Sequence, residues 1–151
     1  MPPTAEAELT IQGPVDTVFA QFIDYRQWAS WMPKGFRPMR GPARPLRKGD
    51  RVLVSVTGLP SLLTVDVVQP STEVSWSGGL PGLLMARHSF YFEDAGAGAT
   101  RIRSVEPWTG LLTKIDPVIK RIVRVAGQVG YAQLEGFERW FAREHGGHAP
   151  H

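Results

Sequence analysis

The chain has 151 residues, 42% hydrophobic and 21% charged, with a formal net charge of +3 at pH 7, which suits a single globular domain with one core. The absence of cysteine excludes a disulfide framework, a thiolate zinc site and a cysteine nucleophile. Residues 1–10 lack the pattern of a signal peptide and no apolar run reaches the ~18 residues of a membrane span, so we expect a cytoplasmic protein without a transmembrane segment.

The first part of the chain predicts one strand followed by two short helices. Residues 7–11 alternate between apolar and polar side chains, which is typical of a strand, and Gly13-Pro14 ends it. Residues 15–23 place their apolar side chains on one helical face. Residues 25–32 predict a second short helix, which Pro33 ends because the residue before a proline avoids helical geometry.

The middle of the chain predicts a meander of six strands. We expect them at residues 36–40, 51–57, 62–69, 72–77, 84–93 and 100–108. Pro38 places the first of these at a sheet edge, because proline has no N–H to donate to a neighbouring strand. Short turns between successive strands predict an antiparallel sheet.

The last long segment, residues 113–144, predicts one amphipathic helix of about eight turns. Apolar residues recur there at steps of three and four, and thus share one face: Ile115, Val118, Ile119, Ile122, Ala126, Val129, Leu134, Phe137, Trp140 and Phe141. A helix this long needs a broad apolar surface, which only the preceding sheet offers. The predicted fold is therefore α+β, with a curved antiparallel sheet of six to seven strands wrapped around the long helix. We expect residues 145–151 to form a frayed tail.

Seven basic residues lie close together in the sequence, with Asp50 as the only acid among them: Lys34, Arg37, Arg40, Arg44, Arg47, Lys48 and Arg51. This basic cluster could serve as a patch for nucleic acid or an anionic membrane. Alternatively, it is a solvated loop and edge strand whose charges discourage edge-to-edge pairing. Because aromatic residues do not alternate with these charges, we expect no nucleic-acid partner.

His88 and Glu106 are the strongest candidates for catalytic or ligand-binding residues, since each shares its predicted strand face with large apolar residues. If their strands pair across a turn at residues 94–99, His88 lies opposite Glu106. The same register sets Phe90 opposite Ser104, and directly opposed side chains have Cβ atoms roughly 4.5–5.5 Å apart. The pair could anchor a ligand carbonyl or hydroxyl, act as general acid and base, or satisfy itself as a structural pair.

Other residues are candidates for lining a cavity. Trp76 and Trp108 offer large apolar faces with one donor each. Tyr131 lies beside Gly127 and Gly130 in the predicted helix, where glycines cost ~1 kcal/mol each and call for a reason such as close packing, a bend or room for a ligand.

Two kinds of site are not expected. The glycine pairs do not open a helix after a strand, so the sequence predicts no phosphate loop and no cofactor. His145, His148 and His151 lie in the tail without a carboxylate scaffold, so we expect no metal site.

Several segments resemble the START/Bet v 1-like (SRPBCC) superfamily, in its polyketide cyclase/dehydrase and lipid-transport branch. They are residues 11–19 (IQGPVDTVF), 28–31 (WASW), 76–83 (WSGGLPGL), 88–93 (HSFYFE) and 100–102 (TRI), together with Glu106. The resemblance covers about residues 5–144 of a single domain, 1–151. It implies the helix-grip fold, with an elongated apolar cavity between the sheet and the long helix. It supplies no catalytic motif that maps residue by residue, and the lack of cysteines excludes the Rieske oxygenase branch.

We therefore expect binding of a small hydrophobic or lipid-like ligand, with access near residues 78–84 and the start of the long helix. The candidate ligand-binding residues are Trp76, His88, Phe90, Ser104, Glu106, Trp108 and Tyr131. One alternative is a polyketide cyclase or aromatase that uses His88 and Glu106 on a poly-carbonyl substrate. Another is membrane or nucleic-acid association through the basic cluster. The chain is expected to be a monomer or a homodimer.

Overall fold

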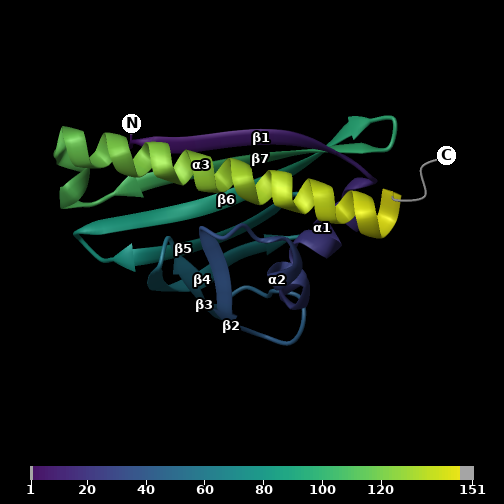
Figure 1. Cartoon of the computed structure of the whole chain (residues 1–151), viewed down its shortest axis with the longest axis horizontal. Coiled ribbons are helices and arrows are strands. Elements are labelled where there is room, and N and C mark those ends of the chain that lie inside the picture. The colour runs from purple at the N-terminus through teal and green to yellow at the C-terminus, as the bar shows by residue number, and fades with distance from the viewer. Residues whose placement is uncertain (1, 147–151) are drawn as a thin grey trace.

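The computed structural model describes residues 2–146. Of the tail expected at residues 145–151, residues 145 and 146 belong to a helical turn, and the rest, with His148 and His151, lies outside the described residues. The sheet consists of β1 (Thr4–Gln12), β2 (Phe36–Arg40), β3 (Arg51–Val56), β4 (Leu59–Gln69), β5 (Glu73–Leu80), β6 (Leu84–Gly96) and β7 (Ala99–Thr109). The helices are α1 (Val15–Phe22), η1 (Tyr25–Gln27), α2 (Trp28–Trp31), η2 (Leu111–Lys114), α3 (Asp116–Phe141) and the π-helical turn η3 (Ala142–Gly146). The predicted α+β helix-grip arrangement is confirmed (Figure 1).

The seven strands form one antiparallel sheet in the order β1-β7-β6-β5-β4-β3-β2. The strand with Pro38 is therefore an edge strand, as predicted. β6 and β7 pair in the expected register, with Phe90 opposite Ser104 and Phe92 opposite Ile102. Helix α3 runs along the sheet beside β1 and β7, whereas β2 and β3 lie away from it on the other side (Figure 1).

Helix α3 begins three residues later than predicted and ends at Phe141. Residues 111–114 form the short turn η2 instead, after Gly110 with a positive φ of 112°. Asp116 and Pro117 then open the helix, because proline is accommodated where a backbone N–H has no helical partner. The continuous face predicted over residues 113–144 is thus shorter at both ends.

The core is an aromatic cluster beneath the C-terminal half of α3. Its members are all buried: Phe19, Phe22, Trp28, Trp31, Phe36, Trp76, Phe90, Phe92, Phe137, Trp140 and Phe141. Phe22 lies at its centre, with ring centroids 4.9 Å from Phe90 and 5.1 Å from Phe137. Because aromatic side chains bury the largest areas, this end of the molecule holds much of the stabilising burial.

The two halves of α3 are buried to different extents. In the C-terminal half, Leu134, Phe137 and Phe141 are almost fully buried. In the N-terminal half, Ile122 and Ala126 occupy equivalent helical positions but remain partly exposed. The tight end of the molecule is therefore the aromatic end, and the open end is where α3 begins.

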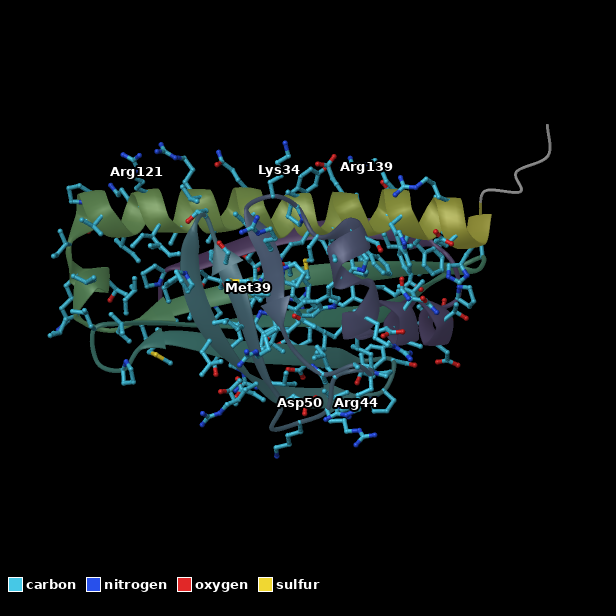
Figure 2. The ribbon with its side chains drawn as sticks, turned by 60° about the horizontal axis from the view of Figure 1, so that its bottom comes forward. Lys34, Met39, Arg44, Asp50, Arg121 and Arg139 are labelled. Carbon is cyan, nitrogen blue, oxygen red and sulfur yellow. The ribbon has the colours of Figure 1, made fainter. Side chains whose placement is uncertain are left out.

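The basic cluster does not form one surface. Arg44 donates two hydrogen bonds to the Asp50 carboxylate at 2.8 and 2.9 Å, and these lower the pKa of Asp50. Lys34 lies beside α3, while Arg44 and Asp50 lie on the opposite side of the molecule (Figure 2). This separation favours the interpretation as a solvated loop and edge strand. No helix in the described part of the chain combines the length and apolarity needed to cross a bilayer.

Candidate functional site

Three polar side chains form a row on the concave face of the sheet. His88 on β6 contacts Ser104 on β7 through Nε2, at 2.6 Å from the hydroxyl oxygen. Its other nitrogen, Nδ1, lies 3.4 Å from a carboxylate oxygen of Glu106. The predicted approach of His88 to Glu106 is thus present, and the register on either side of the pair supports it. The contact with Ser104 was not predicted, because it depends on how the imidazole leans along the strand.

The row can hold its protons in two ways without a charge on the ring. A neutral imidazole has one N–H donor and one acceptor nitrogen. In the first arrangement, Nδ1–H donates to the Glu106 carboxylate and Nε2 accepts from the Ser104 hydroxyl. In the second, a protonated Glu106 donates to Nδ1, and Nε2–H donates to Ser104. The two arrangements differ by one proton, so protonation of Glu106 determines which ring nitrogen carries the hydrogen.

Burial determines the charge state of the row. It lowers the pKa of His88 to about 3 and raises the pKa of Glu106 to about 7, because both charged forms lose their hydration. The ring is therefore neutral at neutral pH, and the carboxyl group is close to half protonated. The contact between Nδ1 and the Glu106 carboxyl is accordingly a polar contact of a neutral ring and not an ion pair.

Helix α3 closes one end of the row through Gly130. A Cβ atom at Gly130 would lie 3.2 Å from the Ser104 hydroxyl oxygen and 4.0 Å from Nε2 of His88. The glycine therefore lets the helix backbone approach the sheet, one of the reasons that its sequence position suggested. At the other end, the Glu106 side chain is 16% exposed. Glu106 is thus the most exposed member of the row.

Trp76 and Phe90 hold the imidazole in place. The Phe90 ring stacks on His88 with centroids 4.1 Å apart, and Trp76 meets it edge-on at 5.8 Å. Trp76 itself packs against Trp28 at 5.1 Å within the core. Trp76 was predicted to line a cavity and Phe90 to bind the ligand; both rings contact the imidazole of His88.

Trp108 lies at an open cleft. The cleft has a volume of about 620 Å³ and is lined by Pro2, Pro3, Gly82, Trp108, Thr109, Gly110, Leu111, Thr113 and Lys114. The indole Nε1 of Trp108 is buried and has no hydrogen-bond partner. Trp108 follows Glu106 by two residues on β7, so both side chains lie on the same face of the sheet. The cleft adjoins the loop at residues 78–84, the region that the sequence suggested for access.

A second, smaller cleft of about 310 Å³ lies between β1 and the start of α3. It is lined by Pro3, Thr4, Ile119, Lys120, Val123 and Arg124. The open space therefore follows the N-terminal half of the helix, on its β1 side.

Tyr131 and His145 lie apart from the row. Tyr131 is 44% exposed, although it follows Gly130 directly. A Cβ atom at Gly127 would meet no other atom within 4 Å, so that glycine is not required for packing. His145 stacks on Phe141 at 4.5 Å. Within residues 2–146 no cluster of three His, Asp or Glu side chains could hold a metal ion.

Comparison with known proteins agrees with this geometry. The sequence profile of the family described as polyketide cyclase/dehydrase and lipid transport matches residues 2–140. The chain belongs to this family. The resemblance seen in the sequence segments is therefore confirmed.

Solved structures with the same fold have low sequence identity to this family member. A protein from Thermobifida fusca has a TM-score of 0.73 at 13% identity, with 95% of each chain covered. A START superfamily protein from Mycobacterium smegmatis has a TM-score of 0.68 at 14% identity, covering 93% of this chain and 98% of its own. The ZhuI aromatase/cyclase from Streptomyces has a TM-score of 0.69 at 16% identity, covering 93% and 94%. The comparison with curated protein sequences gives no match.

Proposed function

We propose that this chain binds a small, mostly apolar molecule that carries a carbonyl or hydroxyl group, between the sheet and the N-terminal half of α3. One observation carries the proposal: Glu106 and Trp108 lie on one face of β7, Trp108 lines the cleft, and neither has its full set of hydrogen-bond partners. The indole N–H of Trp108 has no partner, and the carboxyl group of Glu106 is partly exposed beyond its contact with His88. Buried donors normally find a partner, so an unpaired one beside open space suits a ligand oxygen.

The burial of α3 supports the same location. Apolar side chains along its first half, Ile119 excepted, are only partly covered, which leaves apolar area for a ligand to bury at ~25 cal/mol per Å². The Trp108 N–H would donate to the ligand oxygen. Glu106, near half protonation at neutral pH, would either donate to a carbonyl or accept from a hydroxyl.

A matched pair of probes tests the polar contacts. 2-Naphthol and naphthalene share an apolar body and differ by one hydroxyl group. Replacing Trp108 by Phe or Glu106 by Leu should weaken 2-naphthol binding about tenfold, the effect of one hydrogen bond, and leave naphthalene binding nearly unchanged. Glu93→Leu, at an exposed carboxylate on the far end of β6, is the control. Equal loss of both probes would show that the two residues act only through packing.

Native mass spectrometry of the protein purified from its own host identifies the ligand class. A native mass above the mass of the denatured chain would show that a molecule co-purifies, and the difference between the two gives the mass of that molecule. Loss of that added mass in the Glu106→Leu variant, but not in Glu93→Leu, would place the molecule at the row.

The second candidate function is acid/base catalysis on a poly-carbonyl substrate. The observation that favours it is the contact of His88 with both Ser104 and Glu106, where burial raises the pKa of the Glu106 carboxyl group to about 7. Such a row would catalyse exchange of acidic C–H protons, and a β-diketone in D₂O is a direct probe. His88→Gln should abolish the catalysed exchange in a protein that stays folded, whereas exchange that persists in this variant would exclude the role.

A further inference from the structure

Exposed apolar side chains gather at one end of the molecule. Of the nine large apolar side chains exposed within the described residues, seven lie at the end of the sheet that holds the β3–β4 turn, the β5–β6 turn and the β7–α3 connection, or in the first turn of α3: Leu59, Leu62, Leu80, Leu83, Leu111, Ile115 and Val118. We call these seven residues the leucine end. It lies where α3 begins, far from the C-terminus of the helix (Figure 1).

The loops of the leucine end are built alike. Each contains a glycine with positive φ directly before an exposed leucine, in the pairs Gly58-Leu59, Gly79-Leu80, Gly82-Leu83 and Gly110-Leu111. Positive φ is accessible to glycine at no steric cost, so these turns are tight and hold the following leucine at the tip. These four leucines therefore lie at the tips of short, well-defined turns.

Hydrogen bonds join two of these loops into one surface. The backbone N–H of Leu111 donates to the carbonyl of Gly82 at 3.0 Å, and that of Leu112 donates to the carbonyl of Leu83 at 3.0 Å. A Cβ atom at Gly110 would lie 2.4 Å from the Leu83 carbonyl oxygen, so the backbones are in direct contact. Leu83 and Leu111 are therefore held side by side.

The turns at the opposite end of the sheet differ in composition. The β4–β5 turn consists of Pro70, Ser71 and Thr72, and the β6–β7 turn at residues 95–98 contains only glycine and alanine. Neither carries an exposed large apolar side chain. Since hairpin turns in this same sheet form without leucine, the leucines are not needed for turning the chain. A concentrated set of exposed apolar side chains indicates a contact surface.

Positive charge surrounds the leucine end. Residues 109–134 contain four exposed basic side chains, Lys114, Lys120, Arg121 and Arg124, against Asp116 as the single acid, which gives this stretch a net charge of +3. The two turns at residues 57–62 and 78–84 carry no charge. Arg121 projects outward from the first half of α3 (Figure 2). An uncharged apolar tip beside a cationic rim complements an anionic lipid surface.

We propose that the leucine end docks on the surface of a lipid bilayer that contains anionic lipids. Leu80, Leu83 and Leu111 enter the headgroup region, and Lys120 and Arg121 lie close to lipid phosphates. A second copy of this chain suits the surface less well, because a two-fold contact would set the same cationic rim against itself. Docking requires no bound ligand and so goes beyond the function proposed above. If that function holds, docking also brings the rim of the larger cleft, at Gly82 and Leu111, to the membrane.

Vesicle flotation tests the apolar part of the surface. The probes are vesicles of phosphatidylcholine alone and of phosphatidylcholine with about 30% phosphatidylserine. The wild-type chain should float with the anionic vesicles. Leu80→Ser with Leu111→Ser should weaken this binding about tenfold, because two apolar groups no longer enter the lipid. Met39→Ser is the matched control, since Met39 is 52% exposed on edge strand β2, outside the leucine end.

A second pair of variants tests the charged rim. Lys120→Gln with Arg121→Gln should weaken binding to the anionic vesicles about tenfold or more, since each basic residue at the lipid surface contributes on the order of 1 kcal/mol. Arg139→Gln, at the far end of the same helix, should have little effect (Figure 2). Added salt should weaken wild-type binding and leave the lysine–arginine variant less affected.

Three results would overturn the proposal. The first is wild-type protein that does not float with anionic vesicles. The second is an equal loss for Met39→Ser and for the leucine variant. The third is a wild-type protein that does not bind vesicles but forms a concentration-dependent dimer, while the leucine variant stays monomeric. That result would assign the surface to a contact with a second copy. Naphthalene binding, measured on the same leucine variant, reports separately on the ligand site and on correct folding.

Discussion

Glu106 gives the polar row a signature that can be measured by titration. Its pKa is raised to about 7 by burial, from 4.5 in the unfolded chain. Between these values the folded protein holds a proton that the unfolded chain has lost, so this group lowers stability as the pH rises from 4.5 through 7. Glu106→Gln cannot ionise. We expect the free energy of unfolding of this variant, relative to that of wild type, to increase by up to about 3 kcal/mol between pH 4.5 and 7. Above pH 7 the difference should stay constant.

Urea denaturation across this pH range measures the effect as a difference between variant and wild type. His88, whose pKa is lowered to about 3, also contributes a pH dependence: its stabilisation decreases as the pH falls from 6.5 towards 3. This contribution has the opposite sign to that of Glu106, so the direction of the pH dependence distinguishes the two groups. Glu93→Gln, at an exposed carboxylate, is the reference substitution. A difference between Glu106→Gln and wild type that does not change with pH would mean that Glu106 ionises normally in the folded protein.

The two tryptophans Trp28 and Trp108 should respond differently to the same change. Trp28 is fully buried and donates its indole N–H to the carbonyl of Phe22 at 3.0 Å. Trp28→Phe leaves that carbonyl unpaired and a cavity behind, and should destabilise the fold by about 2–4 kcal/mol. Trp108→Phe removes a buried donor that has no partner, so it should change stability by less than about 1 kcal/mol. Thermal or urea unfolding compares the two, and equal costs would contradict the assignment of Trp108 to an open site.

At the level of elements, three glycines in α3 allow packing to be separated from helix propensity. Gly127→Ala adds a methyl group into open space and should stabilise the protein by about 1 kcal/mol, the helical preference of alanine over glycine. Gly136→Ala would place its Cβ atom 2.3 Å from the backbone carbonyl oxygen of Trp31, so α2 must move. We expect it to destabilise by roughly 2 kcal/mol or more, as overpacking of a close contact does.

Gly130→Ala should fall between these two variants, because its Cβ atom would press on the Ser104 hydroxyl group at 3.2 Å. Chemical denaturation of the three variants gives the order of stability directly. If the Gly136→Ala variant were as stable as the Gly127→Ala variant, this order would be contradicted. Such a result would mean that α2 does not pack against α3.

The elements themselves followed from the sequence wherever one local pattern was decisive. Alternating apolar residues fixed the register of β6 and β7, and hence the approach of His88 to Glu106. The start of α3 was less predictable, because Ile115 fits the apolar period yet lies before the helix. The contact between Gly130 and Ser104 joins residues from different elements, and no periodicity within either element encodes such a contact.

On the scale of the whole molecule, the chain has two contrasting ends. One end holds the aromatic core under α1, α2 and the C-terminal half of α3, and the other carries the open clefts and the leucine end. The polar row lies between them, closed on the side of Gly130 and open on the side of Glu106. Composition alone could not predict this polarity, since a tryptophan suits the core and the wall of a cavity equally well.

This polarity predicts that α3 does not open as one unit. Amides at residues 132–140 lie over the aromatic core, whereas those at residues 120–128 belong to the half whose sheet-facing side chains are partly exposed. Local opening costs less free energy where fewer apolar contacts are lost. We therefore expect hydrogen exchange at residues 120–128 to be at least about tenfold faster than at residues 132–140, even though both segments are regular helix.

A bound ligand should slow hydrogen exchange in the first half of α3 only, and so reduce the difference in rate between the two segments. Naphthalene in the proposed site would cover the first half of α3 and slow exchange at residues 120–128, while residues 132–140 keep their rate, because the aromatic core is already closed. Exchange of both segments in step, with or without naphthalene, would mean that the helix opens as a single cooperative unit. The uneven burial of α3 would then have no energetic consequence and would no longer support a binding site under the first half of the helix.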